Sequence, residues 1–152
     1  TEALGVMRIE KGHVAGNELD GRTTADDLGL GRMMSTKKDF IGRVMAARPA
    51  LVDSKRPKLV GLRPRDRGKR LYAGAHLLPL GAAHVAENDE GIITSVAFSP
   101  SLDHWIGLGF IVGGAERIGQ TAMMVDFMRD SFIEVELCAP VFVDPKGARL
   151  RG

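Results

Sequence analysis

The chain has 152 residues, a length that suits one domain, or one domain with part of another. Hydrophobic residues make up 44% of it, which excludes a disordered protein, and no apolar run approaches the ~20 residues that a membrane-spanning helix needs. The net charge of +2 is divided unevenly, with +7 over residues 1–70 and −5 over residues 71–152, which indicates a charged partner surface rather than a nucleic-acid binder.

The chain opens with a helical pattern that ends at Gly12. Leu4 and Met7 recur at helical spacing, and a helix commonly ends on a glycine in the left-handed conformation. Glu10 therefore falls in the last turn, where the helix dipole disfavours a carboxylate. An acid at this position indicates either a solvated or ion-paired glutamate or a contact with a ligand.

Turns and two short helices are predicted next. Residues 16–21 have the composition of a turn, and Thr24 is expected to cap a short helix that carries two aspartates near its start. A second amphipathic helix is predicted from Phe40 to Arg48, because apolar side chains recur there four residues apart. We expect Asp39 to cap this helix and Pro49 to close it.

A basic stretch follows from Arg48 to Arg70, with nine Lys or Arg residues against two aspartates. Basic stretches can bind phosphate backbones, but this one contains no aromatic side chain that could stack on a base. We therefore disfavour nucleic-acid binding. The pattern instead predicts a linker over residues 50–57 and an edge strand over residues 58–62, whose basic side faces solvent or a partner.

From Lys58 onward the apolar residues recur with a period of two, which is typical of β-strands. Further strands are predicted at residues 71–78, 92–98, 105–112, 122–128 and 132–139. The turn at residues 129–131 has the length of a hairpin connection. Short antiparallel strands at this spacing predict an α+β, mainly β fold with a small Greek-key or jelly-roll-like barrel, or a sandwich.

The residues alone reveal no catalytic set. Asp103 and His104 with Ser99 or Ser101 could be read as a hydrolase triad, but adjacent residues rarely orient one another and there is no nucleophile elbow. The four histidines are scattered, without the spacing of metal ligands. Cys138, the single cysteine, excludes an internal disulfide and suits a structural role in a reducing cytoplasm.

Motifs along nearly the whole chain resemble one family. Residues 8–12, 16–20 and 38–43 resemble the Arg-x-Glu-x-Gly, Gly-Asn-Asp/Glu-x-Asp and Asp-Phe-x-Gly motifs of the aminomethyltransferases, which are the glycine cleavage T-proteins and their relatives. Similarity to the family's C-terminal barrel is found at residues 59–62, 91–95 and 99–102. Residues 21–33 and 140–150 are most similar to the C-terminal part of the α subunits of heterotetrameric sarcosine oxidases.

This resemblance implies a division of the chain and a ligand. Residues 1–49 would be the C-terminal end of a mixed α/β folate-binding domain, residues 50–57 a linker, and residues 58–152 the C-terminal β-barrel domain. Glu10 falls on the family's pterin-binding glutamate, with Arg8 beside it as the second folate-site residue, which is expected to orient Glu10 or to pair elsewhere in the structure. A carboxylate suits this role because it accepts two parallel N–H bonds from one edge of a pterin.

The resemblance also implies a reaction and partners. Sarcosine oxidase demethylates sarcosine oxidatively, and tetrahydrofolate captures the released carbon as 5,10-methylenetetrahydrofolate. FAD, FMN and NAD would bind outside this chain, to the other subunits or to the missing N-terminal part of the same subunit. Because the chain begins at Thr1 and lacks the family's earlier acidic residue, we expect a fragment that is inactive alone and contains no catalytic residue. The alternatives are a fragment of a stand-alone aminomethyltransferase and a non-catalytic subunit-assembly barrel.

Overall fold

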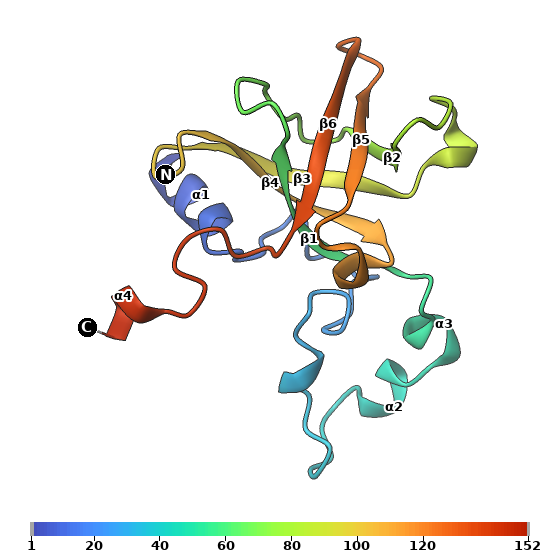
Figure 1. Ribbon diagram of the computed structural model, residues 1–152. Helices are drawn as coiled ribbons and strands as arrows, with labels where there is room; N and C mark the ends of the chain where they lie inside the picture. Colours follow the sequence, from blue (N-terminus) through green and yellow to red (C-terminus); the bar gives the residue numbers. More distant parts are fainter. Residues whose placement is uncertain (1, 152) are drawn as a thin grey trace.

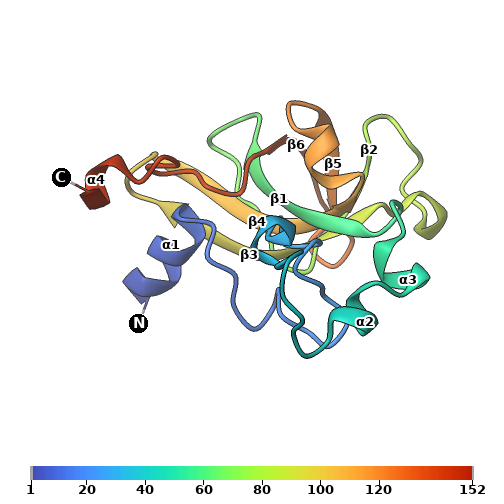
Figure 2. The same cartoon turned by 90° about the horizontal axis from the view of Figure 1, so that it is seen from below.

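The computed structural model describes residues 2–151, which form a closed six-stranded antiparallel β-barrel with a few short helices (Figures 1 and 2). The strands are β1 (Pro57–Pro64), β2 (His76–Pro79), β3 (Gly91–Ser99), β4 (His104–Val112), β5 (Thr121–Asp126) and β6 (Ser131–Cys138). The α-helices are α1 (Glu2–Glu10), α2 (Arg43–Ala46), α3 (Pro49–Val52) and α4 (Ala148–Arg151), and the 3₁₀ turns are η1 (Gly31–Met33), η2 (Ala86–Asn88) and η3 (Gly114–Arg117). The predicted mainly β barrel is confirmed. No helix in residues 2–151 is long and apolar enough to cross a membrane.

The strands follow one another around the barrel in the order β1-β4-β3-β2-β5-β6, and β6 pairs again with β1. Leu59 of β1 lies opposite Phe110 of β4, while Leu62 of the same strand lies opposite Leu137 of β6. The prediction of an edge strand at residues 58–62 is therefore wrong. Closure of the ring gives β1 a hydrogen-bonded neighbour on each side.

The main core fills the inside of the barrel. In β6 the alternating residues Ile133, Val135 and Leu137 are buried, as the period of two predicts. Strand β1 differs, because it buries residues on both of its faces. On the outside, Leu59 and Ile106 pack with Ile9 of α1 in a second cluster. Helix α1 therefore covers the outer surface of β3 and β4 (Figure 2).

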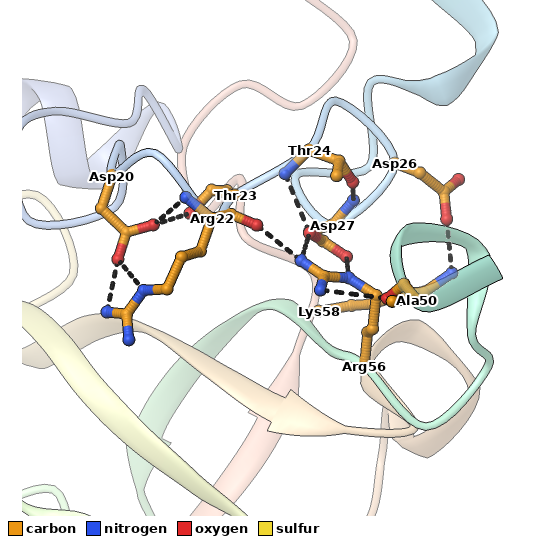
Figure 3. Close-up of polar contacts among 9 residues, drawn as sticks. All are labelled: Asp20, Arg22, Thr23, Thr24, Asp26, Asp27, Ala50, Arg56 and Lys58. Atoms are coloured by element: carbon orange, nitrogen blue, oxygen red, sulfur yellow. Dashed lines mark hydrogen bonds and ion pairs between the residues drawn. The ribbon is translucent and has the colours of Figure 1, made fainter. Parts of the chain in front are cut away.

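Polar contacts fasten the segment after α1 to the start of the barrel (Figure 3). Arg56 donates to both carboxylate oxygens of Asp27, at 3.1 and 2.5 Å. The Thr24 hydroxyl accepts from the Asp27 N–H, and the Asp27 carboxylate accepts from the Thr24 N–H. Burial opposes ionisation of Asp27, but the bonds from Arg56 and Thr24 outweigh it and lower the pKa of that carboxyl. The predicted cap is present, whereas the predicted helix is wrong, because residues 25–29 form only a turn.

The region around the predicted helix 40–48 forms an arm that extends away from the barrel (Figure 1). Only Arg43–Ala46 are helical, because Gly42 precedes them with a φ of 94° and ends any continuation toward Phe40. Asp39 does not cap this helix but pairs with Arg43 at 2.5 Å. Pro49 begins α3, whose remaining residues lie in the predicted linker over residues 50–57. The arm, residues 30–52, leaves several large apolar side chains exposed.

The later strands agree closely with the predictions. Strands β3, β4, β5 and β6 lie within two residues of their predicted bounds, and the β5–β6 hairpin pairs Asp126 with Ser131. The exception is the predicted strand at 71–78, which begins only at His76. Gly74 has a φ of 85°, so a turn replaces the first half of that strand.

Candidate functional site

The end of α1 is set by Gly12, as predicted. Gly12 has a φ of 70°, the His13 N–H donates to the Arg8 carbonyl at 2.7 Å, and the Gly12 N–H donates to the Ile9 carbonyl at 3.0 Å. These two bonds form the Schellman ending of a helix. A Cβ at Gly12 would also collide with the Pro140 carbonyl. The glycine thus allows the C-terminal stretch to lie against the last turn of α1.

Glu10 lies in this last turn with its side chain turned away from bulk solvent, at 9% exposure. Its Oε1 atom accepts a hydrogen bond from the Ser99 hydroxyl at 2.5 Å. Its backbone carbonyl accepts from the N–H groups of Phe142 and Val143, at 2.9 and 3.0 Å. Within residues 2–151 the carboxylate forms no ion pair, and its Oε2 atom has no hydrogen-bond partner. A ligand can therefore still reach acceptor positions on this carboxylate.

A groove of about 510 Å³ lies over this part of α1. Its apolar lining consists of Leu4 and Met7, which are 70% and 61% exposed, and Val143. Its polar lining consists of Arg8, Glu10, Lys11, His13, Asp144 and Arg149. The size and the mixture of apolar walls with a few polar groups are typical of small-molecule sites, which span roughly 300–1,000 Å³.

Arg8 lines the same groove, so the two residues predicted for the folate site lie together. Its guanidinium, however, is occupied by the protein. It donates to Glu18 Oε2 at 3.1 Å and to the Ser95 hydroxyl at 2.8 Å. Arg8 therefore ties α1 to β3 and makes no bond to the Glu10 carboxylate.

Glu18, which was not predicted as a site residue, is the most buried acid of the site at 1% exposure. Besides Arg8, it accepts hydrogen bonds from the Ala15 N–H at 2.8 Å and from the hydroxyls of Thr94 and Ser95, at 2.6 and 2.5 Å. Consecutive side chains of a regular strand point to opposite faces. Here the register of β3 shifts between Ile93 and Ser95, and this bulge brings both hydroxyls to one carboxylate oxygen.

These contacts determine the charge of Glu18. Burial alone would raise its pKa, but the hydrogen bonds from Ser95, Thr94 and Ala15, together with the charge of Arg8, lower the pKa below its ordinary value of 4.5. Glu18 is therefore an anion that holds α1, the following turn and β3 together. Its position in the Gly-Asn-Glu motif was visible in the sequence, but two of its four donors, the hydroxyls of Thr94 and Ser95, come from a strand more than seventy residues away.

Ser99 and His104, considered above for a hydrolase triad, contact other groups rather than each other. The Ser99 hydroxyl donates to Glu10, and His104 Nδ1 bonds the Trp105 carbonyl at 2.8 Å. Burial raises the pKa of the Cys138 thiol, an effect that nearby Arg63 only partly offsets. No group of three His, Cys, Asp or Glu residues in the described part of the chain could hold a metal ion.

Comparisons with known proteins bear on this site. Residues 58–144 match the glycine cleavage T-protein C-terminal barrel domain. The chain is 42% identical, over 98% of its length, to the sarcosine oxidase subunit alpha of Rhizobium meliloti (strain 1021), of which it covers 15%. It is 34% identical, over 90% of its length, to an aminomethyltransferase of Saccharopolyspora erythraea, of which it covers 35%.

A solved structure agrees with these matches. The glycine cleavage system aminomethyltransferase T from Bartonella henselae superimposes with a TM-score of 0.72 and 25% sequence identity, over 94% of this chain and 38% of that one. The match extends beyond residues 58–144, so the shared architecture includes much of the segment that precedes the barrel. The chain spans at most about two fifths of each of these relatives.

Proposed function

The chain belongs to the family of the glycine cleavage T-protein C-terminal barrel domain, and from this premise we propose that it forms one wall of a tetrahydrofolate site in a sarcosine oxidase α subunit. The observation that carries the proposal is the carboxylate of Glu10. It is largely buried, free of any ion pair within the described residues, and faces a groove with apolar walls. In the proposal, residues 1–49 end the folate-binding domain, residues 50–57 link it, and residues 58–152 form the barrel.

The chemistry of Glu10 suits the pterin edge of a folate. A pterin presents two neighbouring N–H donors, and a carboxylate with open acceptor positions can receive both. The Ser99 hydroxyl donates to one carboxylate oxygen, so the carboxylate is oriented before a ligand binds. The apolar side chains of Leu4, Met7 and Val143 supply surface for a flat ring. Arg8 serves the site by fixing α1 through Glu18.

In this reading the chain binds and orients the folate, and the oxidation occurs elsewhere. Tetrahydrofolate captures the carbon that leaves sarcosine, as 5,10-methylenetetrahydrofolate, while FAD, FMN and NAD bind other parts of a cytoplasmic complex. No residue of this chain is proposed to transfer a proton or an electron. The chain alone is expected to be inactive.

The test is Glu10→Gln in the whole subunit that carries this chain, with Glu2→Gln as the control at the other end of the same helix. Replacing a charged acceptor should weaken binding of 5-formyltetrahydrofolate about tenfold or more in equilibrium dialysis. Glu2 is exposed, and its variant should bind as the parent does. Equal affinity in the Glu10 variant and the parent would remove the basis of the proposal.

The competing assignment is a stand-alone aminomethyltransferase. Identity of 42% to a sarcosine oxidase subunit against 34% to an aminomethyltransferase favours the former. Tagged whole subunit should co-purify with the other subunits of a sarcosine oxidase. Recovery of the subunit by itself, with intact folate binding, would favour the aminomethyltransferase instead. Co-purification together with no binding of folate would favour a barrel that serves assembly only.

A further inference from the structure

A second, smaller cavity lies where the ends of β1 and β6 meet the start of β4, and it shares no lining residue with the groove over α1. Its charged lining comes from Arg63 and Arg67, and no acidic side chain lines it. His104 completes the polar part, and apolar side chains such as Leu102 and Phe142 form the rest. Two guanidinium groups in a partly apolar recess favour an anion.

The two arginines have donors to spare. Arg63 Nε is buried and has no hydrogen-bond partner in the described part of the chain, since Glu136 Oε2 lies 3.8 Å away. This nitrogen is closed to solvent, so a ligand in the cavity would contact the rest of the Arg63 side chain, which is 39% exposed. Arg67 is exposed and forms no ion pair within residues 2–151. Its neighbour Arg65, by contrast, pairs with Glu134 at 3.2 Å.

His104 lines this cavity and is only 3% exposed. A carbonyl oxygen only accepts, so the bond of Nδ1 to the Trp105 carbonyl places the ring hydrogen on Nδ1. This leaves Nε2, which has no hydrogen-bond partner within the described residues. Nε2 can accept from the hydroxyl of a hydrogen phosphate, or donate to an oxygen when the ring is protonated.

The volume of the cavity limits the size of the ligand that it can hold. The cavity measures about 170 Å³, whereas sites for drug-sized ligands span roughly 300–1,000 Å³. At about 30 Å³ of liquid volume per water molecule, it has room for only about five or six waters. We propose that Arg63, Arg67 and His104 form a binding site for a small tetrahedral oxyanion of the phosphate class. This site is independent of the proposed folate groove.

The test is a titration of the chain with inorganic phosphate, followed by NMR at constant ionic strength. Saturable shifts are expected in the side-chain Nε–H signals of Arg63 and Arg67 and in the backbone amides of residues 139–142, of which Pro140 has none. Sulfate should compete for the same signals, because it is the same class of ion, and chloride should not. The absence of saturable shifts with phosphate would overturn the proposal.

Two variants distinguish specific binding of phosphate in this cavity from nonspecific attraction by positive charge. Arg67→Gln should weaken phosphate binding about tenfold, because it removes a charged donor of the site. Arg65→Gln removes the same charge two residues away, from a side chain that does not line the cavity, and should leave the affinity unchanged. Equal weakening by both variants would show only nonspecific attraction and would refute the site. Arg67 is exposed, so its variant keeps the fold even if a change at buried His104 does not.

Discussion

Replacement of Glu18 by glutamine probes the network that positions α1. The variant keeps the shape of the side chain but turns one carboxylate oxygen into an N–H donor, which then faces groups that are themselves donors. Glu18 is 1% exposed and the Arg8 side chain only 23%, so bulk water can replace at most part of the lost bonds. Leaving a buried charge without its partner costs about 3–5 kcal/mol. We expect Glu18→Gln to lower the free energy of unfolding by about that amount.

Urea denaturation at pH 7, followed by far-ultraviolet circular dichroism, measures this loss. Glu134→Gln is the matched control, because its side chain is 46% exposed in a cross-strand pair with Arg65, and it should cost less than about 1 kcal/mol. A loss below about 1 kcal/mol for Glu18→Gln as well would refute the reasoning, since the buried network would then contribute no more than a surface pair.

The difference in stability between the parent and Glu18→Gln has a defined pH dependence. The pKa of Glu18 is lower in the folded chain than its ordinary value of 4.5, so its ionisation stabilises the fold fully above that value. This contribution is lost as the pH falls through the folded pKa. The difference in stability between parent and Glu18→Gln should therefore be constant near pH 7 and shrink below pH 4.5. A difference that grows on acidification would contradict the assigned direction.

Two further predictions concern single sites. Gly12→Ala should lower the free energy of unfolding by more than the ~1–2 kcal/mol that a left-handed residue costs, because its Cβ also meets the Pro140 carbonyl. Thermal denaturation measures this loss. The control is Gly5→Ala, which has open space inside α1 and should be neutral or stabilising. Cys138 is 5% exposed with a raised thiol pKa, so it should react with a thiol reagent much more slowly in the native chain than in urea; equal rates would contradict its burial.

Local patterns predicted those parts of the fold that depend on local chemistry. The end of α1 follows from the φ of one glycine, and the β5–β6 hairpin follows from the alternation of apolar residues about a short turn. The same approach failed for residues 40–48, where apolar side chains at helical spacing lack any surface in the described chain to pack against. Ile41 and Val44, at 105% and 83% exposure, show why spacing alone did not make a helix there.

Properties that arise between distant segments could not be predicted. Whether β1 is an edge depends on β6, whose pairing closes the ring more than seventy residues later. The role of Glu18 depends on a bulge in β3 that brings two hydroxyls to one oxygen. Glu10 itself was found through the family motif. Its partner Ser99 lies 89 residues away, so no local spacing could have indicated it.

Closure of the barrel has a consequence for how the chain can associate. An open sheet offers a row of free backbone groups to which another polypeptide can add a strand. In this ring every strand has a neighbour on each side along at least part of its length, so no strand is left as a full-length edge. Recognition through side chains is therefore the main mode open to subunits or neighbouring domains. The arm at residues 30–52, with Ile41 and Val44 uncovered, offers the apolar surface that such recognition needs.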